Sequence, residues 1–247
     1  VSASFGSTFG FGFLLLAATP LVLVGASVAL PFRAGMFNLG GEGQLLIGAL
    51  VGVEVAVAFP AAGGTPVSFV VPLAAAAAAG AVPAALAGVL KAWRGVNEIV
   101  TTIMLNFILV LAVQYLVRGP LEGAGAVYPT TDIVPTPFRL GHVGPSSVVP
   151  VGFVVAVVVA VATWLLTQYS RLGWRQRLIG LNVRVAARQG VRVRREWLVA
   201  LALGGALAGL GGAAEALGNQ LRVGYNFSPG WGWDAVLPYF VRAEDNQ

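Results

Sequence analysis

Amide and carboxylate side chains gather in one short stretch of this otherwise apolar chain, FRAGMFNLGGEGQ at positions 32–44. Asn38, Glu42 and Gln44 lie within it, and glycines stand on both sides of them. An ionisable residue at membrane depth is costly, and it is usually either paired or functional. These three side chains are therefore the first candidates for a functional site.

A second polar cluster, NEIVTTIMLN, begins at Asn97. Glu98, Thr101 and Thr102 approach one face of a helix, and Asn106 extends that stripe by one turn. Such a ridge on an apolar helix has two interpretations. Thr and Asn commonly join membrane helices by hydrogen bonds, and a polar ridge can also line a path for a solute. The residues alone leave both open.

Basic residues dominate a third stretch, positions 170–196. Within it, Asn182 is a good N-cap and Gly190 a good residue just beyond a helix C-terminus, so we predict a short helix at Val183–Gln189. Such a helix suits docking to a cytosolic partner. The alternative is that the arginines only fix topology and touch anionic lipid headgroups. The side chains that docking would use are Arg184, Ala186, Ala187 and Arg188.

The elements that must position these groups are membrane helices. Of 247 residues, 57% are hydrophobic and 10% are charged, and the mean hydropathy is +0.82; soluble domains carry about 25% charged residues. Lipid offers the backbone no hydrogen-bond partners, so long apolar runs must be helical. We predict an all-α polytopic membrane protein with about six spans, and leave open whether the second starts unwound at its glycines. The runs are 9–30, 39–59, 67–90, 98–117, 148–168 and 197–217.

The basic residues also predict the orientation. Eight of the 15 Lys and Arg residues lie between Arg171 and Arg195. If this loop is cytoplasmic, eleven basic residues lie inside and four outside, as the positive-inside rule requires. Residues 118–147 then form a long external loop. Because the basic residues lie between apolar runs, the net charge of +5 does not indicate a nucleic-acid partner.

Four stretches in order carry a resemblance: FRAGMFNLGGEGQLLIGAL, NEIVTTIMLNFI, GLNVRVAARQGV and NFSPGWGWDA. Together they resemble the permease subunits of bacterial ABC importers for nucleosides and simple sugars, in the branched-chain amino acid and ribose permease family. The resemblance covers about residues 10–236. It implies a bacterial cytoplasmic-membrane location and three kinds of partner protein: a second related permease, a cytoplasmic ABC ATPase and an external substrate-binding lipoprotein.

The resemblance also assigns residues to roles. It implies a substrate pathway at Asn38, Glu42, Gln44, Asn97, Glu98, Thr101, Thr102 and Asn106. It implies an ATPase-coupling segment at Gly180, Asn182, Ala186, Ala187 and Gly190, and a later polar-aromatic motif at 227–235. After that motif the chain departs from the family pattern, with VLPYFVRAEDNQ. We therefore expect a single permease domain that lacks spans at both ends.

We predict that the chain is a permease subunit of an ATP-driven importer, with nucleosides favoured over sugars. It has no G-x-x-x-x-G-K-[ST] phosphate loop, so we expect no cofactor in this chain and ATP use by the partner subunit. The alternative is an ion-coupled secondary transporter with Glu42 or Glu98 as the proton carrier. A membrane enzyme finds no support, because the sequence offers no paired acids, Ser–His set or metal cluster.

Overall fold

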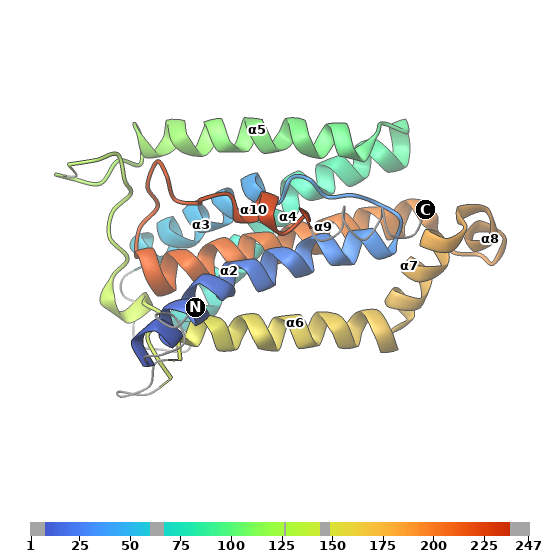
Figure 1. The fold of residues 1–247 in the computed structure, drawn as a ribbon. Coiled ribbons are helices and arrows are strands. Elements are labelled where there is room, and N and C mark those ends of the chain that lie inside the picture. The colour runs from blue at the N-terminus through green and yellow to red at the C-terminus, as the bar shows by residue number, and fades with distance from the viewer. Residues whose placement is uncertain (1–7, 60–66, 126, 144–148, 238–247) are drawn as a thin grey trace.

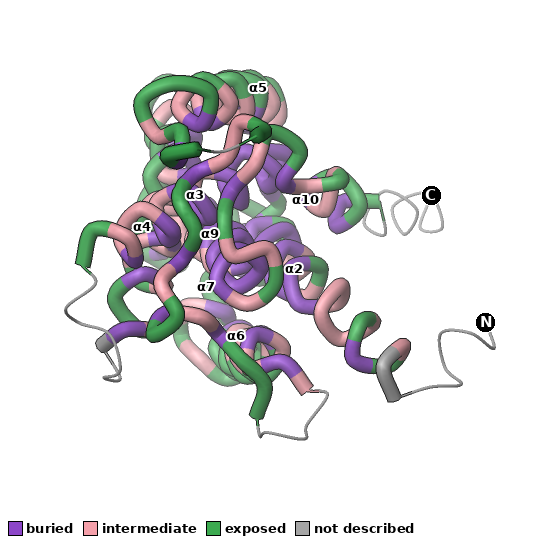
Figure 2. Tube along the Cα trace, turned by 90° about the vertical axis from the view of Figure 1, so that its left-hand side faces the viewer, coloured by how far each residue is buried: buried purple, intermediate pink, exposed green. Residues whose placement is uncertain are grey.

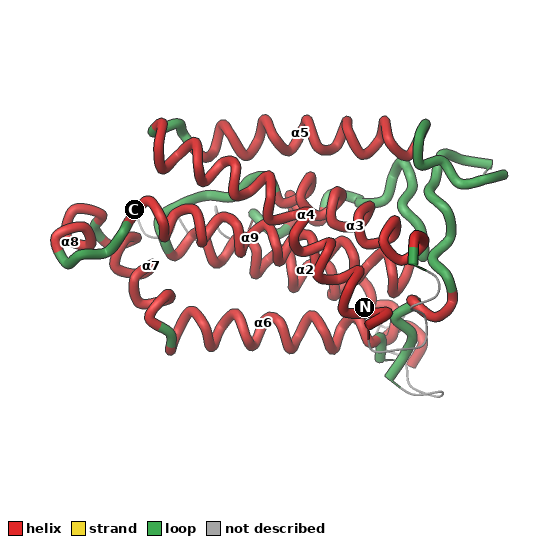
Figure 3. Tube along the Cα trace, turned by 180° about the vertical axis from the view of Figure 1, so that it is seen from behind, coloured by secondary structure: helices red, strands yellow, loops and turns green. Residues whose placement is uncertain are grey.

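The computed structural model describes residues 8–59, 67–125, 127–143 and 149–237, and its regular elements there are helices (Figure 3). Six helices are long and apolar enough to cross a membrane. This confirms the predicted all-α class and the six spans. The long helices are α2 (Thr8–Arg33), α3 (Gly41–Ala58), α4 (Val67–Val89), α5 (Glu98–Val117), α6 (Val151–Tyr169) and α9 (Val193–Glu215).

Helix α9 forms the centre of the bundle, with α2, α3 and α4 packed around it. The view along the bundle shows the buried residues concentrated there, with α5 and α6 on opposite outer sides (Figure 2). Glycines allow this close packing, because a Cβ at Gly48 would lie 2.3 Å from Gly209 Cα, and one at Gly80 would lie 2.3 Å from Gly205 O. Small residues at helix interfaces are the usual means of tight packing in lipid.

Two non-helical segments turn back into the bundle from its opposite ends (Figure 1). Residues 34–40 return from the end of α2 to the start of α3, so the second apolar run is unwound only before Gly41. At the other end, a π-helical turn, η4 (Ala216–Gln220), follows α9, and Leu221 has a left-handed backbone with a φ of 58°. The chain then leads to the short helix α10 (Trp231–Asp234), about midway along the bundle.

The long loop between α5 and α6 is packed in its middle, not fully solvated. Thr131 N donates to Val223 O at 2.9 Å, and Val134 N donates to Leu221 O at 2.8 Å. The loop also contains η3 (Thr136–Phe138), in which Phe138 is buried. The loop thus braces the segment that carries the chain from α9 to α10.

The basic end of the bundle, which we define by Arg33, Lys91, Arg94 and residues 171–195, holds three further helices. They are η2 (Leu90–Arg94), α7 (Arg171–Leu181) and α8 (Val183–Arg188). The capped helix α8 was predicted and ends one residue earlier than expected, whereas α7 was not predicted. The described parts of the 118–150 loop lie at the opposite end (Figure 1), so the structure separates the two ends as the predicted orientation requires.

Candidate functional site

The polar residues of the first stretch fold the backbone before α3. The Asn38 and Gln44 side-chain amides form a reciprocal pair, with N–O distances of 2.8 and 2.9 Å. Asn38 Oδ1 also accepts from Gly40 N at 3.2 Å. Irregular backbone at membrane depth requires such partners, since lipid supplies none. Asn38 and Gln44 are both buried, and their hydrogen bonds hold the turn that precedes α3.

The ridge on α5 completes this support. Thr102 Oγ1 accepts from Leu39 N at 3.2 Å, and Asn106 Oδ1 accepts from Gly43 N at 2.6 Å. Both side chains are buried. The structure thus shows the hydrogen bonding between helices that was one of the two sequence interpretations.

The residues at the start of the same ridge, Asn97, Glu98 and Thr101, lie near the basic end of the bundle. Asn97 caps α5 by accepting from Ile99 N at 2.9 Å, and Thr101 Oγ1 donates to Asn97 O at 2.9 Å. Glu98 forms an ion pair with Lys91 of η2. These three residues start and fix α5, and the structure does not bring them to the cavity described next.

Glu42, in the first turn of α3, links the start of that helix to α10. Its Oε2 accepts from Gly232 N of α10 at 2.7 Å. The backbones are so close that a Cβ at Gly232 would lie 2.3 Å from Glu42 N. Ser228 Oγ supports α10 by accepting from Gly230 N at 3.2 Å and Trp231 N at 3.3 Å.

A cavity of about 310 Å³ lies where α3, α5 and the 225–233 segment meet. Its walls combine one carboxylate, three side-chain amides and two hydroxyls with aromatic rings, a combination that can hydrogen-bond and stack on a polar ring. The lining residues are Glu42, Leu46, Asn106, Phe107, Val110, Gln114, Tyr225, Asn226, Phe227, Ser228, Pro229, Gly230 and Trp233. Of the predicted pathway residues, only Glu42 and Asn106 line it.

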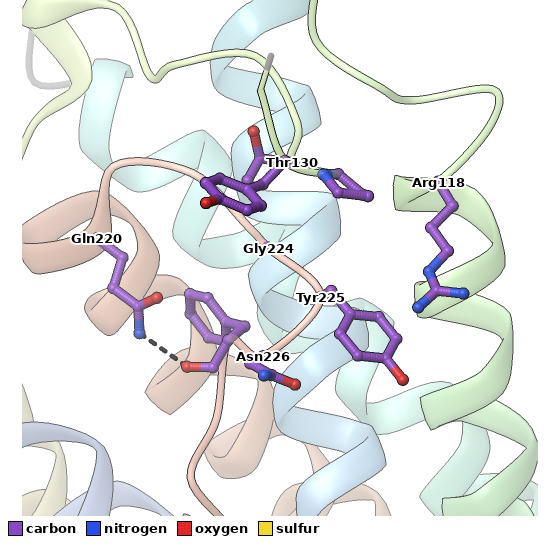
Figure 4. A pocket seen from close by; sticks show the side chains of 9 residues that line it. Arg118, Thr130, Gln220, Gly224, Tyr225 and Asn226 are labelled. Carbon is purple, nitrogen blue, oxygen red and sulfur yellow. Dashed lines mark hydrogen bonds between the residues drawn. The ribbon is translucent and has the colours of Figure 1, made fainter.

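A second pocket, of about 340 Å³, lies toward the end opposite the basic end and shares Tyr225, Asn226 and Phe227 with the cavity. Figure 4 shows the Arg118 side chain beside the Tyr225 ring, and the guanidinium carbon lies 4.0 Å from the ring centroid. Gln220 Nε2 donates to Phe227 O at 2.8 Å and fixes this wall. Because this second pocket shares a wall with the cavity and lies on the side of the 118–150 loop, we call it the outer pocket.

The predicted coupling segment has the expected caps. Asn182 Oδ1 accepts from Arg184 N and Val185 N, and Gly190 has a φ of 79°. Ala186 is buried against Ile179 and so holds α8 onto α7. Arg184, Ala187 and Arg188 are exposed and form the outward face of α8.

Gly180 connects this segment to the bundle. A Cβ at Gly180 would lie 2.3 Å from Arg33 O and 3.4 Å from Gly35 N. Gly35 itself has a φ of 70° and begins the return toward the cavity. The end of α7 therefore rests directly on the turn from which residues 36–40 run to Glu42.

Comparison with known proteins identifies the family. The model of the branched-chain amino acid transport system permease component matches residues 10–241. The chain belongs to this family. The comparison with solved structures gave no match. The resemblance inferred from the four stretches is confirmed.

Several curated relatives of this chain are named as ABC transporter permease proteins. The glucose ABC transporter permease protein TsgB13 of Haloferax volcanii is 38% identical, over 93% of this chain and 63% of its own length. The guanosine ABC transporter permease protein NupP of Bacillus subtilis is 34% identical, over 87% and 62%. The nucleoside permease protein NupB of Lactococcus lactis is 27% identical, over 87% and 61%. The chain therefore spans less than two thirds of these relatives, whose names favour ATP-driven over ion-coupled transport.

The sequence did not reveal which residues of this permease form the cavity. Gln114 was not among the predicted pathway residues, although it lies about two turns beyond Asn106 on the same helix. The 227–235 motif was noticed through the resemblance, but its contact with Glu42 was not predicted. For α7, the missed signal was Ser170, whose Oγ accepts from Gly173 N as an N-cap.

Proposed function

We propose that this permease forms part of the membrane pathway of an ATP-driven importer for nucleosides or related sugars. The observation that carries the proposal is the cavity at the junction of Glu42 and α10, where two interrupted segments meet about midway along the bundle. Interrupted helices that meet at mid-depth form the substrate sites of many transporters. The polar ridge of α5 then both supports the backbone and lines the path at Asn106.

The chemistry of the cavity favours an uncharged, hydroxyl-rich solute with a ring. Glu42, Asn106 and Asn226 offer hydrogen bonds, whereas Phe107 and Trp233 offer flat apolar faces. Nucleosides and simple sugars carry both kinds of group. The names of the guanosine and glucose relatives point to the same two classes.

The energy source and the remaining walls would come from other subunits. The outward face of α8 suits a cytoplasmic ATPase, which would use the ATP. Phe107 lines the cavity and is 58% exposed, so a second related permease packed on α5 would close the path. An external lipoprotein would deliver the solute at the end opposite the basic end. The permease would lie in the cytoplasmic membrane, with its basic end toward the cytoplasm.

The test is uptake by cells that express the full-length permease together with its ABC ATPase partner. Radiolabelled guanosine and glucose are the probes, and uptake of either above the level of cells lacking the permease is expected. Ala187→Trp places a large ring on the exposed face of α8 and is expected to lower ATPase co-purification about tenfold. Thr136→Trp, a matched bulky change on the opposite end, should leave co-purification unchanged.

Two results would contradict this function. One is an ATPase that never co-purifies with the wild-type permease. The other is uptake that stays undiminished when ATP is depleted while the proton gradient is maintained, because ion-coupled transport would behave in that way. Equal co-purification of wild type and Ala187→Trp would remove α8 from the docking surface.

A further inference from the structure

A pocket of about 370 Å³ lies at the basic end, where α7 meets the start of α9. Arg175 comes from α7, Arg195 and Glu196 come from the first turn of α9, and Arg192 is the N-cap residue of α9. Gly190, which follows α8, completes the lining. Three arginines and one carboxylate leave the lining with a net charge of +2. The pocket therefore attracts an anion.

Glu196 shows what else the ligand must supply. Its side chain is only 4% exposed, and Oε1 accepts from Arg175 Nη1 at 3.2 Å. In the part of the chain that the structure describes, the buried Oε2 has no hydrogen-bond partner. A buried acceptor without a donor is costly. A ligand that carries a hydroxyl beside its anionic group would meet both needs of this pocket.

The position of the pocket points to the membrane surface. Helix α9 begins as a membrane span at Val193. Trp174 of α7 and Trp93 of η2 are 55% and 54% exposed, and tryptophan is enriched where membrane meets water. Helix α8, which carries the proposed ATPase contact, extends beyond α7 away from the bundle (Figure 1). The arginines of α8 do not line the pocket.

We propose that this pocket binds the headgroup of phosphatidylglycerol from the cytoplasmic leaflet. The arginines hold its phosphodiester, and a glycerol hydroxyl donates to Glu196 Oε2. Basic pockets on the cytoplasmic side of membrane proteins bind anionic headgroups in this manner. This site is separate from the transport cavity, and its test needs no transport activity.

The experiment is native mass spectrometry of the purified full-length permease, titrated with phosphatidylglycerol, phosphatidylmethanol or phosphatidylcholine. Phosphatidylmethanol has the same phosphodiester charge but no headgroup hydroxyl. Wild type is expected to bind phosphatidylglycerol best and phosphatidylcholine least. Arg195→Gln, a change at an exposed side chain, is expected to weaken phosphatidylglycerol binding about tenfold.

Two variants serve as controls for charge and for the hydroxyl contact. Arg194→Gln removes the same charge from the neighbouring residue, which does not line the pocket, and should change the affinity by less than about twofold. Glu196→Gln retains an acceptor for Arg175 but loses the free carboxylate oxygen. It should therefore abolish the preference for phosphatidylglycerol over phosphatidylmethanol, a ratio measured within one variant.

Three outcomes would overturn the proposal. Equal losses in Arg194→Gln and Arg195→Gln would mean that diffuse charge attracts lipid. Competition by soluble glycerol phosphate at the same concentration as the lipid would assign the pocket to a soluble ligand. Loss of ATPase co-purification in Arg195→Gln with lipid binding intact would assign it to the ATPase surface.

Discussion

Uptake of the transported solute is expected to fall about tenfold or more when Glu42 is replaced by alanine, because a buried N–H loses its acceptor. That N–H belongs to Gly232, and the bond is the side-chain link that ties α10 to α3. Without it, the wall of the cavity that carries Trp233 is held by fewer hydrogen bonds, and the solute loses a carboxylate partner. Membrane abundance is expected to stay near wild type, because the six-helix bundle packs elsewhere.

Two further variants separate the causes. Glu42→Gln keeps an acceptor for Gly232 N but removes the charge, so uptake should fall less than in Glu42→Ala. Glu54→Ala removes a carboxylate three turns along the same helix, at a residue that does not line the cavity, and should transport normally. If the Glu42→Ala variant is present at normal abundance and takes up solute at the wild-type rate, Glu42 has only a packing role.

Gly180→Val is expected to uncouple ATP hydrolysis from transport. A side chain there collides with the Arg33 carbonyl and pushes α7 away from the turn that leads to the cavity. The outward face of α8 is untouched, so the ATPase should still co-purify. Solute-stimulated ATP hydrolysis and uptake should both fall about tenfold. A tenfold change corresponds to about 1.4 kcal/mol, which lies within the range by which single mutations change the coupling between sites.

The matched control for Gly180→Val is Gly25→Ala on α2, where an added Cβ meets nothing within 4 Å. It should leave hydrolysis and uptake unchanged. If Gly180→Val transports at the wild-type rate, motion of α8 does not reach the cavity through the Arg33 turn. If it loses the ATPase altogether, the variant has altered docking, and the coupling role is likewise contradicted.

Hydropathy predicted the six spans because lipid forces every long apolar run to be helical. It could not predict the cavity, since Glu42 and Gly232 are 190 positions apart and only packing brings them together. The polar ridge was predicted as one unit. The structure divides it because Asn97 starts α5 at the basic end, whereas Asn106 lies more than two turns further along the helix.

The coupling segment shows a similar division. Caps are local, so Asn182 and Gly190 predicted the ends of α8 to within one residue. The sequence does not distinguish the two neighbouring alanines, yet Ala186 is buried against α7 and Ala187 is exposed. Helix α7 itself was missed because its arginines interrupt the apolar pattern that marks the spans.

Solute protection of a single thiol in the cavity tests the central claim most directly. The chain has no cysteine, so Asn226→Cys adds one thiol on the wall shared by the cavity and the outer pocket. In intact cells, an impermeant maleimide should label Cys at 226, and excess solute should slow that labelling. Gln189→Cys, just beyond α8, should remain unlabelled. Labelling at 226 that is unchanged by saturating solute, in cells that take the solute up, would contradict the assignment of this cavity to the pathway.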